Sequence, residues 1–293
     1  MRAFCITTDS NSDLPKEYIE KYNTTIIPQY YSFGNTVYGD ELNMEPSEFY
    51  ERMKKGELPQ SQANNPATIE EKFRAILDKG MDIIHIAFSS KLSGSYNNVC
   101  MVARELVEEY EGANITVIDT LNVSLAESIL YLYAENMKAN GATYGEIVTK
   151  IEEMKNHINT TFVVDDLFHL QRGGRVSKTT AVVGSALNLK PILYINSDGG
   201  LTSDGTIRGR KKSLRMLVER MIEALEEETD YSIPVGIVHS LCMEDAQAVA
   251  DIVKQETKFT NVIINDISPS IGTHAGPLAL GIMHYGKIKK AAK

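Results

Sequence analysis

An apolar run, a serine-rich loop and an amphipathic stretch follow one another in DIIHIAF-SSKLSGS-YNNVCMVARELVEE, residues 82–109. The first seven residues are rich in isoleucine and predict a buried strand, Asp82–Phe88. Apolar residues at helical spacing predict a helix over Tyr96–Glu109, and a further strand is predicted at Ile115–Asp119. Strand, helix and strand in this order favour a parallel sheet covered by helices. The fold class is therefore predicted to be α/β.

The same alternation continues on both sides of this unit. Further strands are predicted at Ala3–Thr8, Thr25–Phe33, Thr36–Tyr38, Thr161–Val164, Pro191–Ile195, Leu201–Ile207, Pro234–His239 and Val262–Ile267. Further helices are predicted at Pro15–Tyr22, Pro46–Lys55, Pro66–Lys79, Ser124–Asn140, Tyr144–Asn156, Arg210–Glu228 and Glu244–Glu256. Gly34-Asn35 and Asp198-Gly199-Gly200 are hairpin signals. The pattern changes near Asn156–Thr161, which predicts two lobes, residues 1–160 and 161–293.

Composition narrows the class of protein. The chain has 293 residues, of which 43% are hydrophobic and 24% charged, as expected of a soluble globular protein with a substantial core. The three cysteines are far apart without a Cys-x-x-Cys pair, so neither a disulfide framework nor a zinc site is expected. No signal peptide, membrane span or nucleotide-binding motif is visible. We therefore expect a cytoplasmic protein with no stable membrane insertion and no cofactor.

Charge is distributed unevenly. The net charge of −9 argues against nucleic acid as a partner. The segment from Arg172 to Arg215, however, contains nine basic and two acidic residues. It therefore carries a charge of +7, and the rest of the chain carries −16. Within it, Arg208-Gly209-Arg210-Lys211-Lys212 opens a helix with the charge that the helix dipole disfavours. A basic face on an acidic protein suits a small anion or an acidic protein partner.

Three polar loops are candidate ligand sites. Asp9–Asp13 and Ser89–Ser95 follow predicted strands, at the sheet edge where open α/β proteins bind ligands. In the second loop, Ser93 or Ser95 either caps the following helix or binds an anionic oxygen beside the unpaired helix amides. The third loop, Gln60–Pro66, lies between two predicted helices.

A histidine lies in an uncharged stretch near the C-terminus, Ser268–Gly286. Its prolines and glycines exclude a membrane helix and indicate sharply bending backbone around His274. Such a histidine can donate a hydrogen bond, carry charge or attack a substrate, or it can be incidental to a turn.

A glycine pair, Gly173-Gly174, lies between Arg172 and Arg175. Two readings are open. The backbone amides and guanidinium groups could form a concave phosphate site, or Gly173 could end a helix with the arginines solvated.

These motifs together resemble the DegV family over nearly the whole chain and in the same order. The segments that carry the resemblance are Thr8-Asp9-Ser10 with Asp13-Leu14-Pro15, Ser61-Gln62, Ser89–Tyr96, Asp165-Asp166-Leu167 with Gly173-Gly174-Arg175, Arg208–Lys212, and Ile271–Pro277. The resemblance implies a two-lobed α/β protein that binds a long-chain fatty acid such as palmitate between its lobes. It also implies a role as the acyl-binding subunit of a fatty acid kinase, which presents the carboxyl group to a separate ATP-binding subunit.

The resemblance also implies roles for individual residues. The carboxylate would be bound by Ser61, Ser93, Gly94, Ser95 and His274, with Asp9, Thr273 and Arg175 near the head group. Arg208, Arg210, Lys211 and Lys212 would dock the kinase. The family usually has Thr-Ser-Gln-Pro-Ser-Pro where this chain has Gln60–Asn65, which lowers the share of binding expected from Ser61.

Two other functions remain open from the residues. Ser93 and His274, with Asp119, could form the triad of an esterase or acyl-transfer enzyme, although Ser93 lacks the Gly-x-Ser-x-Gly spacing. Alternatively, His274 could bind a small carbonyl compound covalently, as in the similar substrate-binding subunits of dihydroxyacetone kinases.

Overall fold

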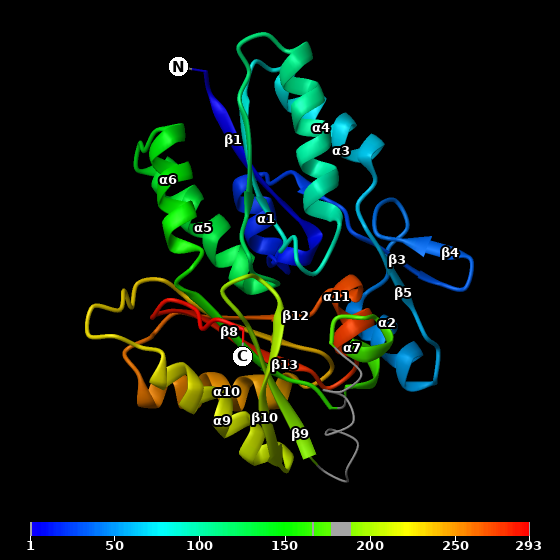
Figure 1. The fold of residues 1–293 in the computed structure, drawn as a ribbon, viewed down its shortest axis with the longest axis vertical. Helices are drawn as coiled ribbons and strands as arrows, with labels where there is room; N and C mark the ends of the chain where they lie inside the picture. Colours follow the sequence, from blue (N-terminus) through cyan, green and yellow to red (C-terminus); the bar gives the residue numbers. More distant parts are fainter. Residues whose placement is uncertain (1, 166, 177–188, 293) are drawn as a thin grey trace.

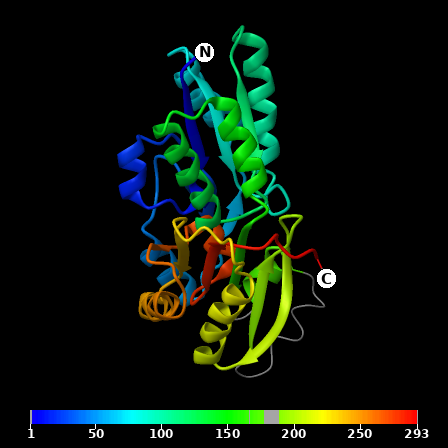
Figure 2. The same cartoon turned by 90° about the vertical axis from the view of Figure 1, so that its left-hand side faces the viewer.

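The computed structural model describes residues 2–165, 167–176 and 189–292. Asp166 and Lys178, which belong to the motif and the basic segment above, lie outside this part of the chain. The described residues form a two-lobed α/β fold, as predicted, with a parallel sheet and its helices at one end and a larger sheet at the other (Figures 1 and 2).

The N-terminal sheet is parallel and has the strand order β2-β1-β6-β7. Its strands are β1 Phe4–Asp9, β2 Ile26–Ile27, β6 Asp82–Ala87 and β7 Ile115–Asp119. The flanking helices are α3 Pro66–Leu77, α4 Ser95–Glu109, α5 Leu125–Ala139 and α6 Tyr144–Met154. Ile83 packs with α3 and α4, whereas Ile84 and Ile86 pack with α5 and α6. Alternate residues of a strand point to opposite faces, so the isoleucine run of β6 fills both layers.

The C-terminal sheet is mixed and has the order β10-β9-β8-β13-β11-β12. Its strands are β8 Ile158–Val163, β9 Leu189–Ile195, β10 Leu201–Arg208, β11 Val235–His239, β12 Val262–Asp266 and β13 Leu280–Tyr285. Helices α9 Arg210–Glu223 and α10 Met243–Glu256 cover one face with a cluster that includes Leu217 and Val249. The last strand, β13, lies between β8 and β11 and is antiparallel to both.

A third, smaller sheet lies at the side of the junction (Figure 1). It comprises β4 Thr36–Tyr38, β3 Tyr30–Phe33 and β5 Gln60–Gln62 in that order, and β3 and β4 form the predicted hairpin. Nearby are α2 Pro46–Lys54, α7 Phe168–Arg172 and α11 Pro269–Ala275, while η1 Ser10–Ser12 and α1 Lys16–Tyr22 follow β1. Helix α11 contacts α2, α7, β3 and β5, so it joins the small sheet to the second half of the chain.

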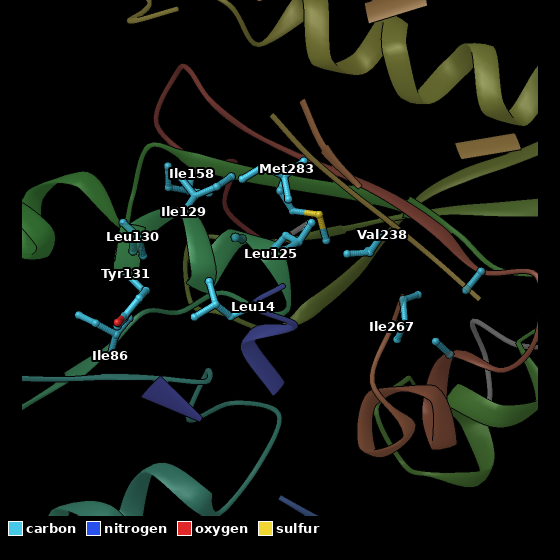
Figure 3. Close-up of a cluster of buried hydrophobic side chains, with 14 of the residues drawn as sticks. Leu14, Ile86, Leu125, Ile129, Leu130, Tyr131, Ile158, Val238, Ile267 and Met283 are labelled. Atoms are coloured by element: carbon cyan, nitrogen blue, oxygen red, sulfur yellow. The ribbon is translucent and has the colours of Figure 1, made fainter. Parts of the chain in front are cut away.

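Helix α5 connects the two large sheets. It contacts β1 and β6 of the parallel sheet and β8, β11 and β13 of the mixed sheet. Figure 3 shows Leu125 and Ile129 of this helix beside Met283 and Ile158 of the mixed sheet. Each of these four side chains is at most 2% exposed. One continuous apolar core therefore runs from one lobe into the other.

Three sequence predictions were wrong in detail. The single strand predicted at Thr25–Phe33 is two strands in different sheets, β2 and β3, separated at Pro28, which has no N–H to continue a ladder. The loop predicted at Gln60–Pro66 contains β5, which pairs with β3. The helix predicted to run to Glu228 ends at Glu223. The following acidic run, Glu226–Glu228, would place negative charge at the negative end of the helix dipole.

The uncharged stretch Ser268–Gly286 also differs from the prediction. Instead of a sharp turn around His274, it forms the short helix α11 and then β13. Ser268 precedes the helix and Pro269 is its first residue, where the missing N–H of proline costs nothing. The backbone bends only after His274, at Gly276, which has a φ of +73°.

Candidate functional site

A cavity lies where the two lobes and the small sheet meet. It contains about 980 Å³ of space not filled by atoms, including the part open to solvent. Most of its wall is apolar and comes from both lobes, including Phe88, Leu92, Phe162, Leu170, Val238 and Met283. Polar side chains also line it: Asn11, Gln29, Ser61, Gln62, Ser93, Ser124, Thr160, Ser270, Arg175 and His274. A cavity whose exposed surface is mainly apolar, with polar groups in its wall, suits a ligand with a large apolar part and a polar head group.

Ser61 and His274 meet at this cavity. The Oγ atom of Ser61 lies 2.7 Å from Nε2 of His274, although the residues are 213 positions apart. Ser61 is held by strand β5 and His274 by the last turn of α11, and β5 contacts α11. The structure thus brings together two of the residues that the family resemblance assigned to the carboxylate.

The imidazole of His274 is neutral in this environment. Burial, and after it the positive charges of Arg175 and Arg172, lowers its pKa to about 3. Its Nδ1 atom is buried and has no hydrogen-bond partner among the described residues. A Cβ atom at Gly173 would lie only 2.0 Å from this Nδ1. The first glycine of the predicted pair is therefore needed to leave room for the histidine ring.

The serine loop places Ser93 and Gly94 on the cavity wall and Ser95 just behind them. Of the two readings of these serines, capping of the helix at its N-cap position is not observed, because Gly94 is the N-cap of α4 and no side chain caps it. Instead, the Ser95 N–H donates to Ser93 Oγ at 3.2 Å, and the two hydroxyl oxygens lie 2.7 Å apart. The two hydroxyls form a chain that leads from the cavity into the protein.

The two arginines of the glycine motif bind backbone carbonyls. Gly173 ends helix α7, which is the structural reading of this motif. Arg175 lines the cavity and donates to the carbonyl of Leu92 at 2.8 and 3.0 Å, and Arg172 donates to the carbonyl of Pro59 at 2.7 Å. Burial lowers the pKa of both guanidinium groups. Both arginines thus connect the segment after α7 to the loops that carry Ser93 and Ser61.

Asp9 and Thr273 lie near the site but do not line the cavity. Asp9 is 1% exposed, and its two carboxylate oxygens accept hydrogen bonds from the N–H groups of Asn11 at 2.8 Å and Phe88 at 3.0 Å. Burial raises its pKa to about 7. The hydroxyl of Thr273 donates to the carbonyl of Pro269 within α11. Direct contact between either side chain and a ligand is therefore not indicated.

The proposed esterase triad is not assembled. His274 is hydrogen-bonded to Ser61 and not to Ser93. Asp119 accepts from the N–H groups of Ser90 and Leu121, both at 3.1 Å. With its pKa lowered to about 3, His274 is also a poor general base at neutral pH.

The basic segment differs in accessibility from residue to residue. Arg208, Lys211 and Lys212 are exposed, at the end of β10 and the start of α9. Arg210, in contrast, is partly buried, pairs with Asp245 at 2.8 Å and donates to the carbonyl of Leu278 at 2.7 Å. Three of the four predicted docking residues are thus available to a partner, whereas Arg210 has a structural role.

Gln29 is a cavity residue that the sequence patterns did not single out, whereas Asn11 belongs to the predicted ligand loop Asp9–Asp13. Each is at most 4% exposed; Asn11 Oδ1 has no partner among the described residues, and the Gln29 side chain interacts with the carboxyl group of Asp9. A glutamine beside Pro28, inside a predicted strand, carries no motif. Its buried position could be found only from the fold.

No group of three or more metal-ligating side chains occurs among the described residues. In the same residues, no helix combines the length and the apolar character that a membrane crossing requires.

Comparisons with known proteins agree with this geometry. A family model described as an uncharacterised protein of the DegV family matches residues 3–287. A DegV domain-containing protein of Clostridium perfringens is 36% identical over 292 residues, 99% of this chain and 100% of that protein.

Two solved structures are similar along almost the entire chain. One is described as DegV, a fatty acid binding protein from Bacillus subtilis; it has a TM-score of 0.84 and 28% identity, covering 98% of this chain and 100% of its own. The other is a hypothetical protein from Thermotoga maritima described as revealing a fatty acid binding function. It has a TM-score of 0.83 and 26% identity, with 98% of this chain and 100% of its own covered.

Proposed function

This chain belongs to the DegV family, and from that premise we propose that it binds a long-chain fatty acid such as palmitate in the cavity between its lobes. The observation that carries the proposal is the pairing of an apolar cavity with the Ser61–His274 contact and the Ser93 hydroxyl on its wall. The carboxylate would lie at these polar groups and the acyl chain along the apolar wall.

The energetics of such a complex are favourable. Burial of about 15 methylene groups at ~0.8 kcal/mol each supplies roughly 12 kcal/mol before the costs of ordering and association are subtracted. A buried carboxylate without partners would cancel this gain, so hydroxyl and amide donors are required at the head group. Ser61, Ser93 and the Gly94 amide are donors on the cavity wall that can serve this purpose, and Ser95 acts behind them through Ser93.

Replacement of Ser93 by alanine is expected to weaken palmitate binding by roughly 1–3 kcal/mol, because a buried carboxylate loses a hydroxyl donor. Ser61→Ala should cost less, because β5 lacks the family's threonine and proline and His274 can still donate. Isothermal titration with palmitate measures both effects. Extraction of the native protein followed by mass spectrometry identifies any fatty acid that copurifies.

The matched control is Ser203→Ala, a serine in β10 that does not line the cavity. It should leave the affinity for palmitate unchanged. If wild-type protein neither contains a fatty acid nor binds palmitate, the proposed function is wrong. Full affinity in the Ser61→Ala/Ser93→Ala protein would mean that the head group binds elsewhere.

We further propose that the protein presents the bound carboxyl group to the ATP-binding subunit of a fatty acid kinase. Arg208, Lys211 and Lys212 support this because they are exposed cations at one place on a chain with a net charge of −9. Such a patch attracts an acidic partner and accelerates association.

Neutralising this patch as Arg208→Gln/Lys211→Gln/Lys212→Gln is expected to leave palmitate affinity unchanged and to reduce phosphorylation by a kinase subunit at least tenfold at low salt. Arg210 stays unchanged because it pairs with Asp245. Lipid titration and a coupled phosphorylation assay at low and raised salt measure the two effects. Lys254→Gln/Lys258→Gln, exposed lysines in the last turn of α10 and just after it, is the control. Wild-type phosphorylation of the triple variant would show that the patch is only a solvated surface.

A further inference from the structure

The hydroxyl chain that starts at Ser93 ends at Gln29. Ser95 Oγ donates to Gln29 Oε1 at 2.6 Å and lies 2.7 Å from Ser93 Oγ. Gln29 is 3% exposed, its Oε1 atom accepts from Ser95, and its side chain interacts with the buried carboxyl group of Asp9. The amide is thus held between a serine hydroxyl and a titratable carboxyl group, and each of its two orientations suits a different protonation state of Asp9.

The direction of the hydrogen bonds follows from counting hydrogens. A serine hydroxyl has one hydrogen, and Ser95 gives its hydrogen to Gln29. Between Ser93 and Ser95, therefore, Ser93 must be the donor. Ser93 then faces the cavity only with an oxygen lone pair. This arrangement suits a head group that donates a hydrogen bond. It disfavours a carboxylate, which can only accept hydrogen bonds.

Rotation of the Gln29 amide by half a turn reverses the whole chain. Nε2 then donates to Ser95, Ser95 donates to Ser93, and the hydrogen of Ser93 points to the ligand. The rotation moves the amide nitrogen from Asp9 to Ser95. Gln29 lies 66 positions from Ser95, so the arrangement is a property of the fold and not of the serine loop alone.

The rotated oxygen also has a neighbour that can satisfy it. Asp9 lies beside the Gln29 amide, and its carboxyl group can donate a hydrogen to the rotated oxygen when it is protonated. Burial raises the pKa of Asp9 to about 7, so the protonated form is accessible near neutral pH. Glu127 and Asp13 are buried carboxyl groups near Asp9, and the charge of Asp9 raises the pKa of each.

We propose that Gln29 is a positioning residue whose amide orientation sets the direction of hydrogen bonding through Ser95 to Ser93, and thereby selects between a carboxylate and a hydroxyl-donating head group. The inference rests on the proposed binding of fatty acids in this cavity. The ligand classes that it separates are long-chain fatty acid anions and neutral long-chain alcohols.

The experiment compares palmitate with 1-hexadecanol, which has the same chain length, in a series of variants. In Gln29→Glu, measured with the other variants at pH 9 so that the buried carboxyl group is ionised, residue 29 only accepts hydrogen bonds and holds the chain in the direction that saturates Ser93. Palmitate affinity should fall by about 100-fold, while hexadecanol affinity stays within about threefold. Gln29→Met keeps the length of the side chain without a hydrogen-bonding amide. It is the size control and should change both affinities by less than about fivefold.

A double variant separates the relay from simple charge repulsion. In Gln29→Glu/Ser95→Ala the link between residue 29 and Ser93 is cut, so the hydrogen of Ser93 is free for the ligand. This protein should regain at least about tenfold of the palmitate affinity lost in Gln29→Glu. Direct repulsion by the new carboxylate would persist in the double variant, so an absence of recovery overturns the relay.

Other outcomes are equally decisive. Failure of wild-type protein to bind palmitate overturns the proposed function itself. If wild-type protein binds palmitate and Gln29→Glu binds it equally well, only the role of Gln29 is wrong. Loss of both ligands in Gln29→Glu would make Gln29 a support for the shape of the cavity and overturn its role in selecting the head group.

An NMR measurement on the wild-type protein tests the rotation directly. The side-chain amide resonances of Gln29 should shift downfield when palmitate is added, and unchanged resonances contradict the rotation.

Discussion

Replacing Gly272 with alanine is expected to destabilise the protein by about 3 kcal/mol or more, because the core around α11 has no room for a methyl group. A Cβ atom there would lie 2.3 Å from the hydroxyl oxygen of Tyr50 and 2.7 Å from its ring. Tyr50 is fully buried and donates a hydrogen bond to the carbonyl of Ile267 at 2.9 Å, so it cannot move away without losing that bond. Urea unfolding measures the change in the free energy of unfolding.

The control for this substitution is Gly145→Ala in helix α6, where an added Cβ meets nothing within 4 Å. It should stabilise slightly, as alanine does in an open helix position. The loss of unfolding free energy in the double variant Gly272→Ala/Tyr50→Phe should be smaller than the sum of the losses in the two single variants. The reason is that the hydroxyl group that collides with the new methyl group is gone. Stability equal to wild type in Gly272→Ala would mean that α11 does not pack on Tyr50 as described.

Asp13→Asn is expected to stabilise the protein at pH 8 and to lose most of that advantage at pH 5. Asp13 is buried, and burial raises its pKa to about 7, with the charge of Asp9 acting in the same direction. Above pH 7 the folded protein therefore bears the cost of an ionised buried carboxylate. As the pH falls through 7, the folded state takes up a proton that the unfolded state does not, and the cost diminishes.

The asparagine suits this position. Asp13 has a φ of +51°, a conformation in which asparagine is common, and its oxygen can still accept from the N–H of Ser268 at 3.0 Å. The stability difference between variant and wild type should shrink by roughly 2–3 kcal/mol from pH 8 to pH 5. Urea unfolding at both pH values measures it, and Asp251→Asn on the surface of α10 controls for net charge. A difference that is independent of pH contradicts a raised pKa at Asp13.

Secondary structure could be predicted from the sequence where a residue pattern is compatible with only one kind of element. The isoleucine run of β6 and the strand β7 were predicted to within one residue, because long apolar strands between helices have few alternatives. The Gly34-Asn35 hairpin was likewise predicted, since the turn residues determine the register of β3 and β4. Among site residues, Ser61, Ser93 and His274 were identified through the family resemblance and do meet the cavity.

The remaining features depend on tertiary packing. Gly272 lowers helix propensity, yet it lies inside α11 because only glycine fits against Tyr50. The three residues of β5, Gln-Ser-Gln, show no apolar alternation and form a strand only because β3 offers an open edge. Gln29 is a polar residue in a predicted strand, and its role depends on a hydrogen bond from Ser95, 66 positions away. Patterns of neighbouring residues cannot reveal such relationships.

The place of β13 has a consequence for synthesis on the ribosome. The strand is formed by residues 280–285 but lies between β8 and β11 in the sheet. Without β13, the edge of β8 that faces away from β9 and the edge of β11 that faces away from β12 would both be unpaired. While the chain emerges, the parallel sheet can form early, whereas the two halves of the mixed sheet stay unjoined until residue 285 has left the exit tunnel. Until then β8 and β11 are open edges of the kind that pair with other chains, and chaperones are expected to bind the nascent protein at this stage. Since α11 precedes β13, His274 also reaches Ser61 only at this late point, and a nascent chain that has exposed fewer than 285 residues has no completed cavity.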